Sequence, residues 1–583
     1  MNLETYISEF SKYVIALIMA LYTLVSFVGV TFKSEKKLHG VFVTQNILMF
    51  AFHFSSFMVI CFETNDVSCL VFYAFQQIVL YAAVMLYKAF YPKSNRLIIN
   101  NMCMMLSVSF VILTRLDYSK SIKQFGIVTV SLVAGLFIPL LIRKVKIIRN
   151  LKWIYCSVGI LLLGIMMILG QTTYGSKISY SIAGISFQPA EFVKILFVFF
   201  VAGFLYKAEG FIDVFTATLF AAIHVGIQVI NKDLGSALIF FIVYICMLFI
   251  ATNNYIYMIL GLACGAAASY VAYDAFRHIQ VRVQAFLDPW SVIDSAGYQI
   301  TQSLFAISSG GWVGLGLYNG TPSSIPFVEA DFIFSALTEE FGIIFGICII
   351  LICVSSFIAF MKVSFRLEDR FYQLVSFGFA ISYIFQIFLT IGGGTKFIPL
   401  TGVTLPLISY GGTSVLCTVI IFSIIEGIYL IQVDEENTEI VHKTVKSGKT
   451  AKADKSVRPA KNVKQIKNTK ASKERPEKRK RKVYYQQSEY ENDDYEEYDD
   501  EYYDEKYDDE YGNDEYGNDE YEDSEYVNEE YSKEDDDLEF IHGYTVNIDQ
   551  EELGKIYYNE EEYEKDKRSA ESKKKNQTTD SCS

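Results

Sequence analysis

The first 433 residues of this chain contain few charged side chains for their length. They hold 25 of the 51 Lys and Arg residues and 20 of the 65 Asp and Glu residues, which leaves a net charge of +5. Residues 434–583 hold the others and carry a net charge of −19. An apolar body followed by a charged tail excludes a soluble cytosolic enzyme, because a water-exposed surface needs more charge than the body has. It also excludes a nucleic-acid binder inferred from overall charge.

Metal-binding and redox motifs are absent as well. The ten cysteines include no CxxC pair, and the six histidines show no HExxH or other metal-ligand spacing. Nine of the cysteines fall in the apolar body, mostly in hydrophobic runs, where a small side chain packs well. The sequence therefore predicts no zinc site and gives the cysteines a packing role.

The apolar body contains thirteen hydrophobic stretches, each close to the 20 or so residues that a helix needs to cross a bilayer core. Acidic Glu4 and Glu9 precede the first stretch and no small-residue cleavage site follows it, so we interpret it as a retained helix rather than a signal peptide. The pattern predicts an all-α polytopic membrane protein. Its expected spans are 12–32, 41–61, 68–88, 97–114, 125–142, 152–170, 189–206, 212–230, 234–252, 256–273, 332–361, 371–391 and 405–431.

Positive charge in the short loops gives an expected orientation, because Lys and Arg collect on the cytoplasmic side. The Lys- and Arg-rich loops alternate along the chain, so they fall on one side of the membrane. With thirteen spans, the N-terminus lies outside, the tail lies in the cytoplasm, and the long loop at 274–330 is extracytoplasmic. The loops that carry this signal are 33–37, 88–96, 143–152, 207 and 362–370.

The tail after residue 433 divides into a basic and an acidic block. Residues 443–482 carry 17 Lys and Arg against three acidic residues, and residues 484–564 are rich in Tyr, Asp and Glu. Blocks of like charge this long stay solvated, so we expect a disordered cytoplasmic tail. The basic block is suited to anionic lipid headgroups or to the acidic block, and the acidic block to a basic partner. A solvated tether without a specific partner is the alternative.

Charged residues at membrane depth are costly, which makes them candidates for function. The segment QPAEFVK places Glu191 and Lys194 on one helix face, three residues apart. They form either a buried ion pair that holds helices together or a cationic site for an anionic substrate. In NKDLGSA, Asp233 lies at the outer mouth of a span, where a helix N-cap is the simplest role.

The loop at 274–330 and the segments that follow it hold the remaining candidates. A loop this long usually has a binding or lid role. Its Arg277 and Arg282 are able to neutralise phosphates, and its GYQ segment contains Gln299. Asp331 follows where the loop enters a helix, as an N-cap or as a general base beside a wet cavity. Lys396 lies in a Gly- and Pro-rich outer segment at 392–414, which we expect to line a cavity.

Together these segments resemble the SEDS family, the FtsW/RodA/SpoVE proteins of bacterial cell-wall synthesis. The resemblance covers about residues 97–431. The occurrence of its motifs in order is a more specific signal than any single motif. It leaves out three N-terminal spans (1–96) and the tail (434–583), and it implies a ten-helix core over 97–433. The motifs are QPAEFVK, DLGSA, the Arg282–Pro289 stretch, GYQ…GGWVGLG, ADFIFSALTEEFG and TGVTLPLISYGGTS.

The resemblance implies a peptidoglycan glycosyltransferase of the bacterial cytoplasmic membrane. Such an enzyme polymerises lipid II outside the membrane, in cell division or elongation, together with a class B penicillin-binding protein, a transpeptidase. The essential Asp of the family matches Asp331, and its Glu–Lys pair matches Glu191 and Lys194. The chain departs from the family pattern before Asp331, where Phe327 replaces a Glu and Glu329 replaces a His.

The implied chemistry assigns a role to each candidate. Asp331 is the expected catalytic base, and Lys194, Arg282 and Lys396, in that order, are the expected cations for the leaving pyrophosphate. Glu191 orients Lys194, and Asp233 and Gln299 complete the substrate-binding set. A divalent cation would suit the pyrophosphate, although no ligand cluster is visible in the sequence. The alternatives are a lipid II flippase and a non-catalytic scaffold of the cell-wall machinery. Charged candidates near the outer face favour chemistry there over transport.

Overall fold

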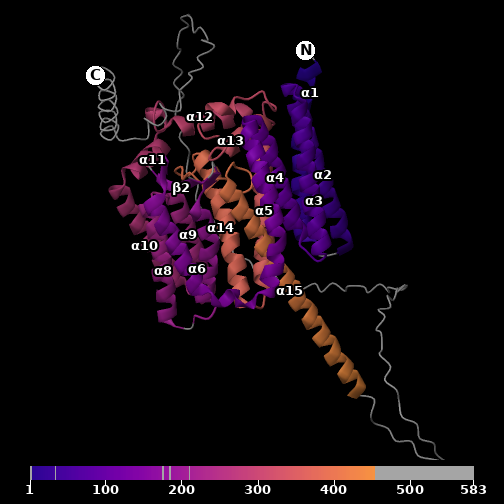
Figure 1. The fold of residues 1–583 in the computed structure, drawn as a ribbon, viewed down its shortest axis with the longest axis vertical. Helices are drawn as coiled ribbons and strands as arrows, with labels where there is room; N and C mark the ends of the chain where they lie inside the picture. The colour runs from indigo at the N-terminus through magenta and orange to yellow at the C-terminus, as the bar shows by residue number, and fades with distance from the viewer. Residues whose placement is uncertain (1–2, 33–34, 174–175, 183–184, 209, 454–583) are drawn as a thin grey trace, which may run out of the picture. The chain divides into compact units, whose positions relative to one another are not determined.

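The computed structural model describes residues 3–453, except 33–34, 174–175, 183–184 and 209. The part of the expected tail after residue 453 lies outside these residues. Figure 1 shows a bundle of long helices, with α1–α3 beside α4 on one side. The helices are α1 (Leu3–Thr31), α2 (Glu35–Thr64), α3 (Val67–Phe90), α4 (Arg96–Leu116), α5 (Tyr118–Lys144), α6 (Lys152–Leu169), α7 (Pro189–Leu205), α8 (Phe211–Ile230), α9 (Leu234–Thr252), α10 (Tyr255–Ala275), α11 (Arg277–Leu287), α12 (Tyr298–Gly310), α13 (Ile333–Arg366), α14 (Arg370–Gly394) and α15 (Gly412–Ala453).

The prediction of an all-α polytopic membrane protein is confirmed. Each of the thirteen predicted spans coincides with a helix, and eleven of these helices are long and apolar enough to cross a membrane. The other two are α6 and α7, with 18 and 17 residues. Helices are expected here because lipid offers the backbone no hydrogen bonds. The structure adds a small antiparallel sheet between α6 and α7, made of β1 (Gln171–Thr173), β2 (Ser176–Ile182) and β3 (Ile185–Phe187).

The last helix differs from its prediction at both ends. The span expected to start at residue 405 begins at Gly412, because residues 400–411 form a loop with Gly402 and Leu407 at positive φ. At the other end α15 continues to Ala453, so residues 434–453 of the expected disordered tail are helical. Two contacts hold the start of this extension, an Arg143–Asp434 ion pair and a hydrogen bond from Glu368 N to the Glu435 carboxylate.

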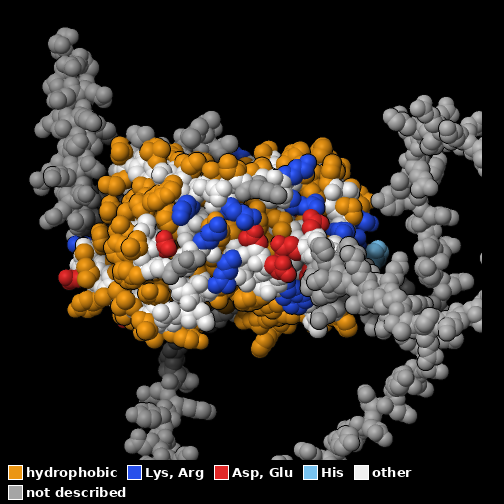
Figure 2. Space-filling view, turned by 90° about the horizontal axis from the view of Figure 1, so that it is seen from below, with side chains coloured by type: hydrophobic (Ala, Val, Ile, Leu, Met, Phe, Trp, Pro, Cys, Tyr) orange, Lys and Arg blue, Asp and Glu red, His pale blue; other side chains and the backbone are white. Residues whose placement is uncertain are grey.

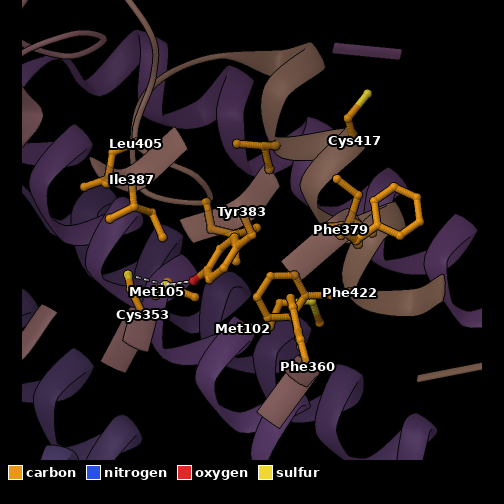
Figure 3. Close-up of a cluster of buried hydrophobic side chains, with 14 of the residues drawn as sticks. Met102, Met105, Cys353, Phe360, Phe379, Tyr383, Ile387, Leu405, Cys417 and Phe422 are labelled. Atoms are coloured by element: carbon orange, nitrogen blue, oxygen red, sulfur yellow. Dashed lines mark hydrogen bonds between the residues drawn. The ribbon is translucent and has the colours of Figure 1, made fainter. Parts of the chain in front are cut away.

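Helix α4 lies at the centre of the bundle. Its residues from Leu97 to Thr114 are all buried, because α1–α3, α5 and α13 pack around it. On its other side α4 meets α13, α14 and α15 in a core of aromatic and sulfur-containing side chains (Figure 3). There the Tyr383 hydroxyl donates to Met105 Sδ at 3.4 Å, and Phe360 contacts both Tyr383 and Phe422.

Helix α1 is joined to this core by buried hydrogen bonds around Asn101 of α4. Its side-chain oxygen accepts from Tyr22 and Ser26 of α1 at 3.1 and 3.2 Å. Its amide nitrogen donates to Ser355 and Ser356 of α13 at 3.3 and 3.2 Å. Interhelical hydrogen bonds in membranes contribute about 0.6–2 kcal/mol each. Although residues 1–96 lie outside the family-like core, α1 therefore packs as part of the same body.

Helix α13 is broken near its N-terminal end by the loop that precedes it. At Gly342 the backbone leaves the helical region, with φ 87° and ψ 169°. The 311–321 loop fills the break, since Leu315 N and Gly316 N donate to the carbonyls of Glu339 and Glu340 at 3.0 and 2.9 Å. The GGWVGLG motif is thus a structural wedge in α13.

Most of the Lys and Arg residues used for the orientation gather at one end of the bundle. Figure 2 views this end and shows Lys, Arg, Asp and Glu side chains in the middle of a hydrophobic rim. An Arg149–Asp369 ion pair at 2.9 Å joins the 143–152 loop to the start of α14. Arg370 donates to the carbonyl of Ile250 at the end of α9. The candidate site residues lie at the opposite end, where the loops at 325–332 and 400–411 meet.

Candidate functional site

Asp331 lies on a short loop that is tied to a second loop far away in the sequence. The Asp331 backbone N–H donates to the carbonyl of Phe327 at 3.1 Å, which closes a turn with Phe327 at φ 59°. The Ser409 hydroxyl donates to the Ala330 carbonyl at 2.5 Å, and Tyr410 N donates to the Glu329 carbonyl at 2.7 Å. The 325–332 and 400–411 loops therefore fix the position of Asp331 together.

The 400–411 loop is itself anchored in the core. Leu405, Leu407 and Ile408 are almost fully buried, and Leu405 lies beside Ile387 of α14 (Figure 3). The Ser409 hydroxyl also accepts from Leu405 N at 2.9 Å. Irregular backbone at membrane depth is tolerated where protein surrounds it, as it does here.

Asp331 and Arg282 share the space above Gly402. Gly402 has φ 72°, and a Cβ atom there would lie 3.7 Å from Asp331 Oδ2 and 3.9 Å from Arg282 Nη2. Arg282, on α11, donates through Nη1 to the carbonyls of Leu400 and Thr401, both at 3.3 Å. A carboxyl group and a guanidinium group thus face one point, and the absence of a side chain at residue 402 leaves that point open.

The environment of Asp331 raises the pKa of its carboxyl to about 6. Burial makes the largest contribution, because it disfavours the charged form. Arg282 lowers the pKa and Glu329 raises it further. The carboxyl is mostly ionised at neutral pH, yet it is a stronger proton acceptor than an ordinary aspartate. These are the properties of a general base.

Glu191 and Lys194 form a buried ion pair in α7 with an N–O distance of 2.7 Å. Lys194 Nζ also donates to Gln386 Oε1 of α14 at 2.6 Å, and Gln386 Nε2 donates to the Thr404 carbonyl at 3.0 Å. The chain of contacts runs from α7 through α14 to the loop that carries Gly402. These contacts match the first sequence-based alternative, a buried pair that holds helices together.

Lys194→Met is expected to lower the stability of the protein by about 3–5 kcal/mol, because it leaves the Glu191 carboxylate buried without its partner. The Glu191→Gln, Lys194→Met double variant removes both charges and is expected to recover part of the loss. Thermal unfolding of the purified full chain in detergent measures both effects. Lys93→Met, at an exposed lysine, is the control. A Lys194→Met variant as stable as the control would contradict the structural role.

Asp233 caps α9 and lies close to the same groups. Its Oδ1 accepts from Ser236 N at 3.1 Å, whereas its buried Oδ2 has no hydrogen-bond partner among the residues that the structure describes. Burial raises the pKa of the Asp233 carboxyl, its hydrogen bonds with Ser236 and the charge of Arg282 lower it, and the charge of Glu191 raises it. The N-cap role is present, and Asp233 is in electrostatic reach of the Arg282 site.

Lys396 and Gln299 lie at the junction of α12 with the ends of α13 and α14. Lys396 follows α14, is partly exposed and has φ 56°. Gln299 is buried in the first turn of α12. One turn further, the Ser303 hydroxyl donates to the Gly394 carbonyl at 2.7 Å and is within 2.6 Å of the Ser335 hydroxyl. In residues 3–453, as far as they are described, no contact joins the Lys396 side chain to Asp331.

Three residues of this site were not predicted from the sequence. Gln386 lies in the apolar α14, and a polar amide in such a run was an available signal. The importance of Gly402 could be recognised only from the fold, because it depends on the side chains that face this glycine. Lys120 of α5 forms an ion pair with Glu329, a contact between residues 209 apart in sequence. Within the described part of the chain, no group of three His, Cys, Asp or Glu side chains is placed to hold a metal ion.

Comparisons with known proteins find relatives for the part of the chain that holds this site. A family model described as "Cell cycle protein", FTSW_RODA_SPOVE, matches residues 93–432. The chain is 37% identical to "Peptidoglycan glycosyltransferase RodA" of Mycobacterium bovis over 273 residues, which is 44% of this chain and 58% of that protein. It is 30% identical to the Mycobacterium leprae protein of the same name, with 58% of this chain and 79% of that protein covered.

A second group of relatives carries another name. The chain is 31% identical to "Probable peptidoglycan glycosyltransferase FtsW" of Aliivibrio salmonicida, with 49% of this chain and 74% of that protein covered. Among solved structures, a chain from a study of "polymerization and crosslinking by a peptidoglycan synthase complex" has a TM-score of 0.50 at 22% identity. That match covers 57% of this chain and 97% of the other, and it supports the fold.

Proposed function

The chain belongs to the FtsW/RodA/SpoVE family, and from this premise we propose that it is a peptidoglycan glycosyltransferase. It would polymerise lipid II into glycan strands at the outer face of the bacterial cytoplasmic membrane, in cell division or elongation. The observation that carries the proposal is that the Asp331 carboxyl and the Arg282 guanidinium approach the same point above Gly402. The peptidoglycan glycosyltransferase names of the relatives support it.

The proposed reaction requires a base and a cation. In lipid II polymerisation a sugar hydroxyl attacks an anomeric carbon and a lipid pyrophosphate leaves. We assign proton abstraction to Asp331, a step worth roughly 10²–10⁴-fold in rate. We assign the leaving pyrophosphate to Arg282, because its guanidinium suits phosphate oxygens and lies near the carboxylate.

The other candidates take supporting roles in this proposal. Glu191 and Lys194 act through Gln386 and Thr404 to position the 400–411 loop, so Arg282 replaces Lys194 as the first cation. Lys396, partly exposed, is a second cation for the lipid pyrophosphate. Asp233 and Gln299 remain substrate-binding candidates on α9 and α12. We also retain the expected orientation, with the N-terminus outside and the tail in the cytoplasm.

The proposal includes a class B penicillin-binding protein as partner. The similar solved structure comes from a peptidoglycan synthase complex that coordinates polymerization and crosslinking, and crosslinking is the reaction of a transpeptidase. The functional test uses the purified full chain in liposomes that contain lipid II, with and without such a partner. Glycan polymer from the chain alone or with its partner supports the glycosyltransferase. Transfer of lipid II across the bilayer without polymer would favour a flippase. The absence of both polymer and transfer would favour a scaffold.

Arg282→Gln is expected to lower the rate of lipid II polymerisation by roughly 10²–10³-fold, as loss of one group that stabilises developing negative charge commonly does. Arg282→Lys keeps the positive charge but loses the paired N–H donors of the guanidinium. Its polymerisation rate is expected to lie between those of the wild type and Arg282→Gln. The control is Arg366→Gln, an exposed arginine at the C-terminal end of α13, far from Arg282. Equal rates for Arg282→Gln and the control would remove Arg282 from the mechanism.

A further inference from the structure

Lys120 links the start of α5 to the loop that carries Asp331. Its ammonium group donates to Glu329 Oε1, two residues before Asp331. Asp117, the N-cap of α5, lies 3.6 Å from the same ammonium and accepts from Lys120 N at 3.0 Å. The side chains of Lys120 and Glu329 are 35% and 20% exposed, so the pair is partly shielded from water. Asp117 therefore holds Lys120 in place for Glu329.

One turn further along α5, Gln124 holds the second loop of the site. Gln124 is fully buried, its Nε2 donates to the Ser409 carbonyl at 3.1 Å, and its Oε1 accepts from Gly411 N at 3.4 Å. Residues four apart share a helix face. The same face of α5 therefore contacts the loop of Asp331 and the loop of Gly402, which lie more than 200 residues away in sequence.

We propose that Lys120 is a positioning residue for the reaction, and that its ion pair with Glu329 holds Asp331 above Gly402 and opposite Arg282. This inference rests on the proposed function. The Lys120–Glu329 pair uses the position at which the resemblance to the family implies a His. Glu329 also places a negative charge beside the base.

The charges that face Asp331 come from two elements. Arg282 approaches from α11 and lowers the pKa of the Asp331 carboxyl, and Glu329 on its own loop raises it. Around Glu329 lie Lys120 and Asp117 from α5 and Tyr410 from the 400–411 loop. Replacing Glu329 by a neutral or positive residue therefore shifts the acid limb of the pH–rate profile to lower pH.

The test measures polymerisation rate and the midpoint of its acid limb for the purified full chain. Lys120→Met is expected to lower the rate roughly tenfold, because small misplacement of a reacting group is costly. Lys120→Arg keeps the pair and most of the rate. The exchange variant, Lys120→Glu with Glu329→Lys, is expected to recover most of the rate lost in Lys120→Glu. Its midpoint lies at lower pH than that of the wild type, which a purely structural role would not predict.

Lys123→Met is the matched control, because Lys123 is an exposed lysine on the same helix without a side-chain partner in the described residues. The inference would be overturned if Lys120→Met polymerised lipid II at the rate of this control. It would also be overturned if the exchange variant were no faster than Lys120→Glu. Hydrogen exchange of residues 325–332 tests it without substrate. Faster exchange in Lys120→Met than in Lys123→Met supports the inference, and equal exchange contradicts it. A wild-type chain without polymer contradicts the proposed function alone.

Discussion

Asp331→Asn is expected to lower lipid II polymerisation by 10²–10⁴-fold, the contribution of a well-placed general base. The amide keeps the shape of the side chain but does not accept the hydroxyl proton. Because the backbone of Asp331 is held by Phe327 and the side chain is not needed for that contact, the fold should be retained. The measurement is the amount of glycan polymer formed per unit time by purified wild type and variant.

The control for this variant is Asp294→Asn, which changes an exposed aspartate in the 274–330 loop that leads to Asp331. It is expected to polymerise lipid II at the wild-type rate. Size-exclusion profiles and thermal unfolding of both variants should match the wild type. A fully active Asp331→Asn variant would remove this carboxylate from the mechanism, and the remaining site would then hold cations without a base.

Gly342→Ala is expected to destabilise the protein by about 3 kcal/mol or more. Two causes add: an L-residue is strained at φ 87°, and a Cβ atom would collide with Gly314 N and lie 2.5 Å from the Trp312 carbonyl. The contacts are backbone atoms of the wedge, which have little room to move. Arg115 ties the 311–321 loop to α13, because its Nη2 donates to the Gly320 carbonyl and its Nε is 2.8 Å from Glu340.

The yield of folded, monodisperse protein and the midpoint of thermal unfolding measure this effect. The control is Gly126→Ala in α5, where a Cβ atom would meet nothing within 4 Å. Alanine is the better helix former, so this control should be as stable as the wild type or slightly more stable. A Gly342→Ala variant that unfolds with the control would mean that the break in α13 is not a fixed part of the fold.

Hydropathy predicted the helices well because each apolar stretch is a local property of the sequence. The start of α15 could not be predicted in this way, since residues 405–408 are apolar but bury their side chains as a loop. Helix α13 was predicted as one continuous span for a similar reason, because the prediction used only local hydropathy. Its break depends on hydrogen bonds from the 311–321 loop to Glu339 and Glu340, and these form only in three dimensions.

The candidate site was predictable to the extent that charge in an apolar region signals function. This argument found Asp331, Arg282 and the Glu191–Lys194 pair. Spacing alone did not decide between a buried ion pair and a cationic substrate site, because residues three apart share a helix face in either case. The third partner, Gln386, decides which contacts the pair makes, and it lies on another helix. The Lys120–Glu329 contact is likewise nonlocal and left no trace in either segment.

The pH dependence of lipid II polymerisation by the purified chain is the most direct test of the central claim, that Asp331 acts as the base of a glycosyltransferase. A base must be deprotonated, and the pKa of the Asp331 carboxyl is raised to about 6. Activity should therefore be low at pH 5, rise through a midpoint near pH 6 and level off above pH 7, if no other group titrates there. A polymerisation rate that stays constant between pH 5 and 8 would contradict the account.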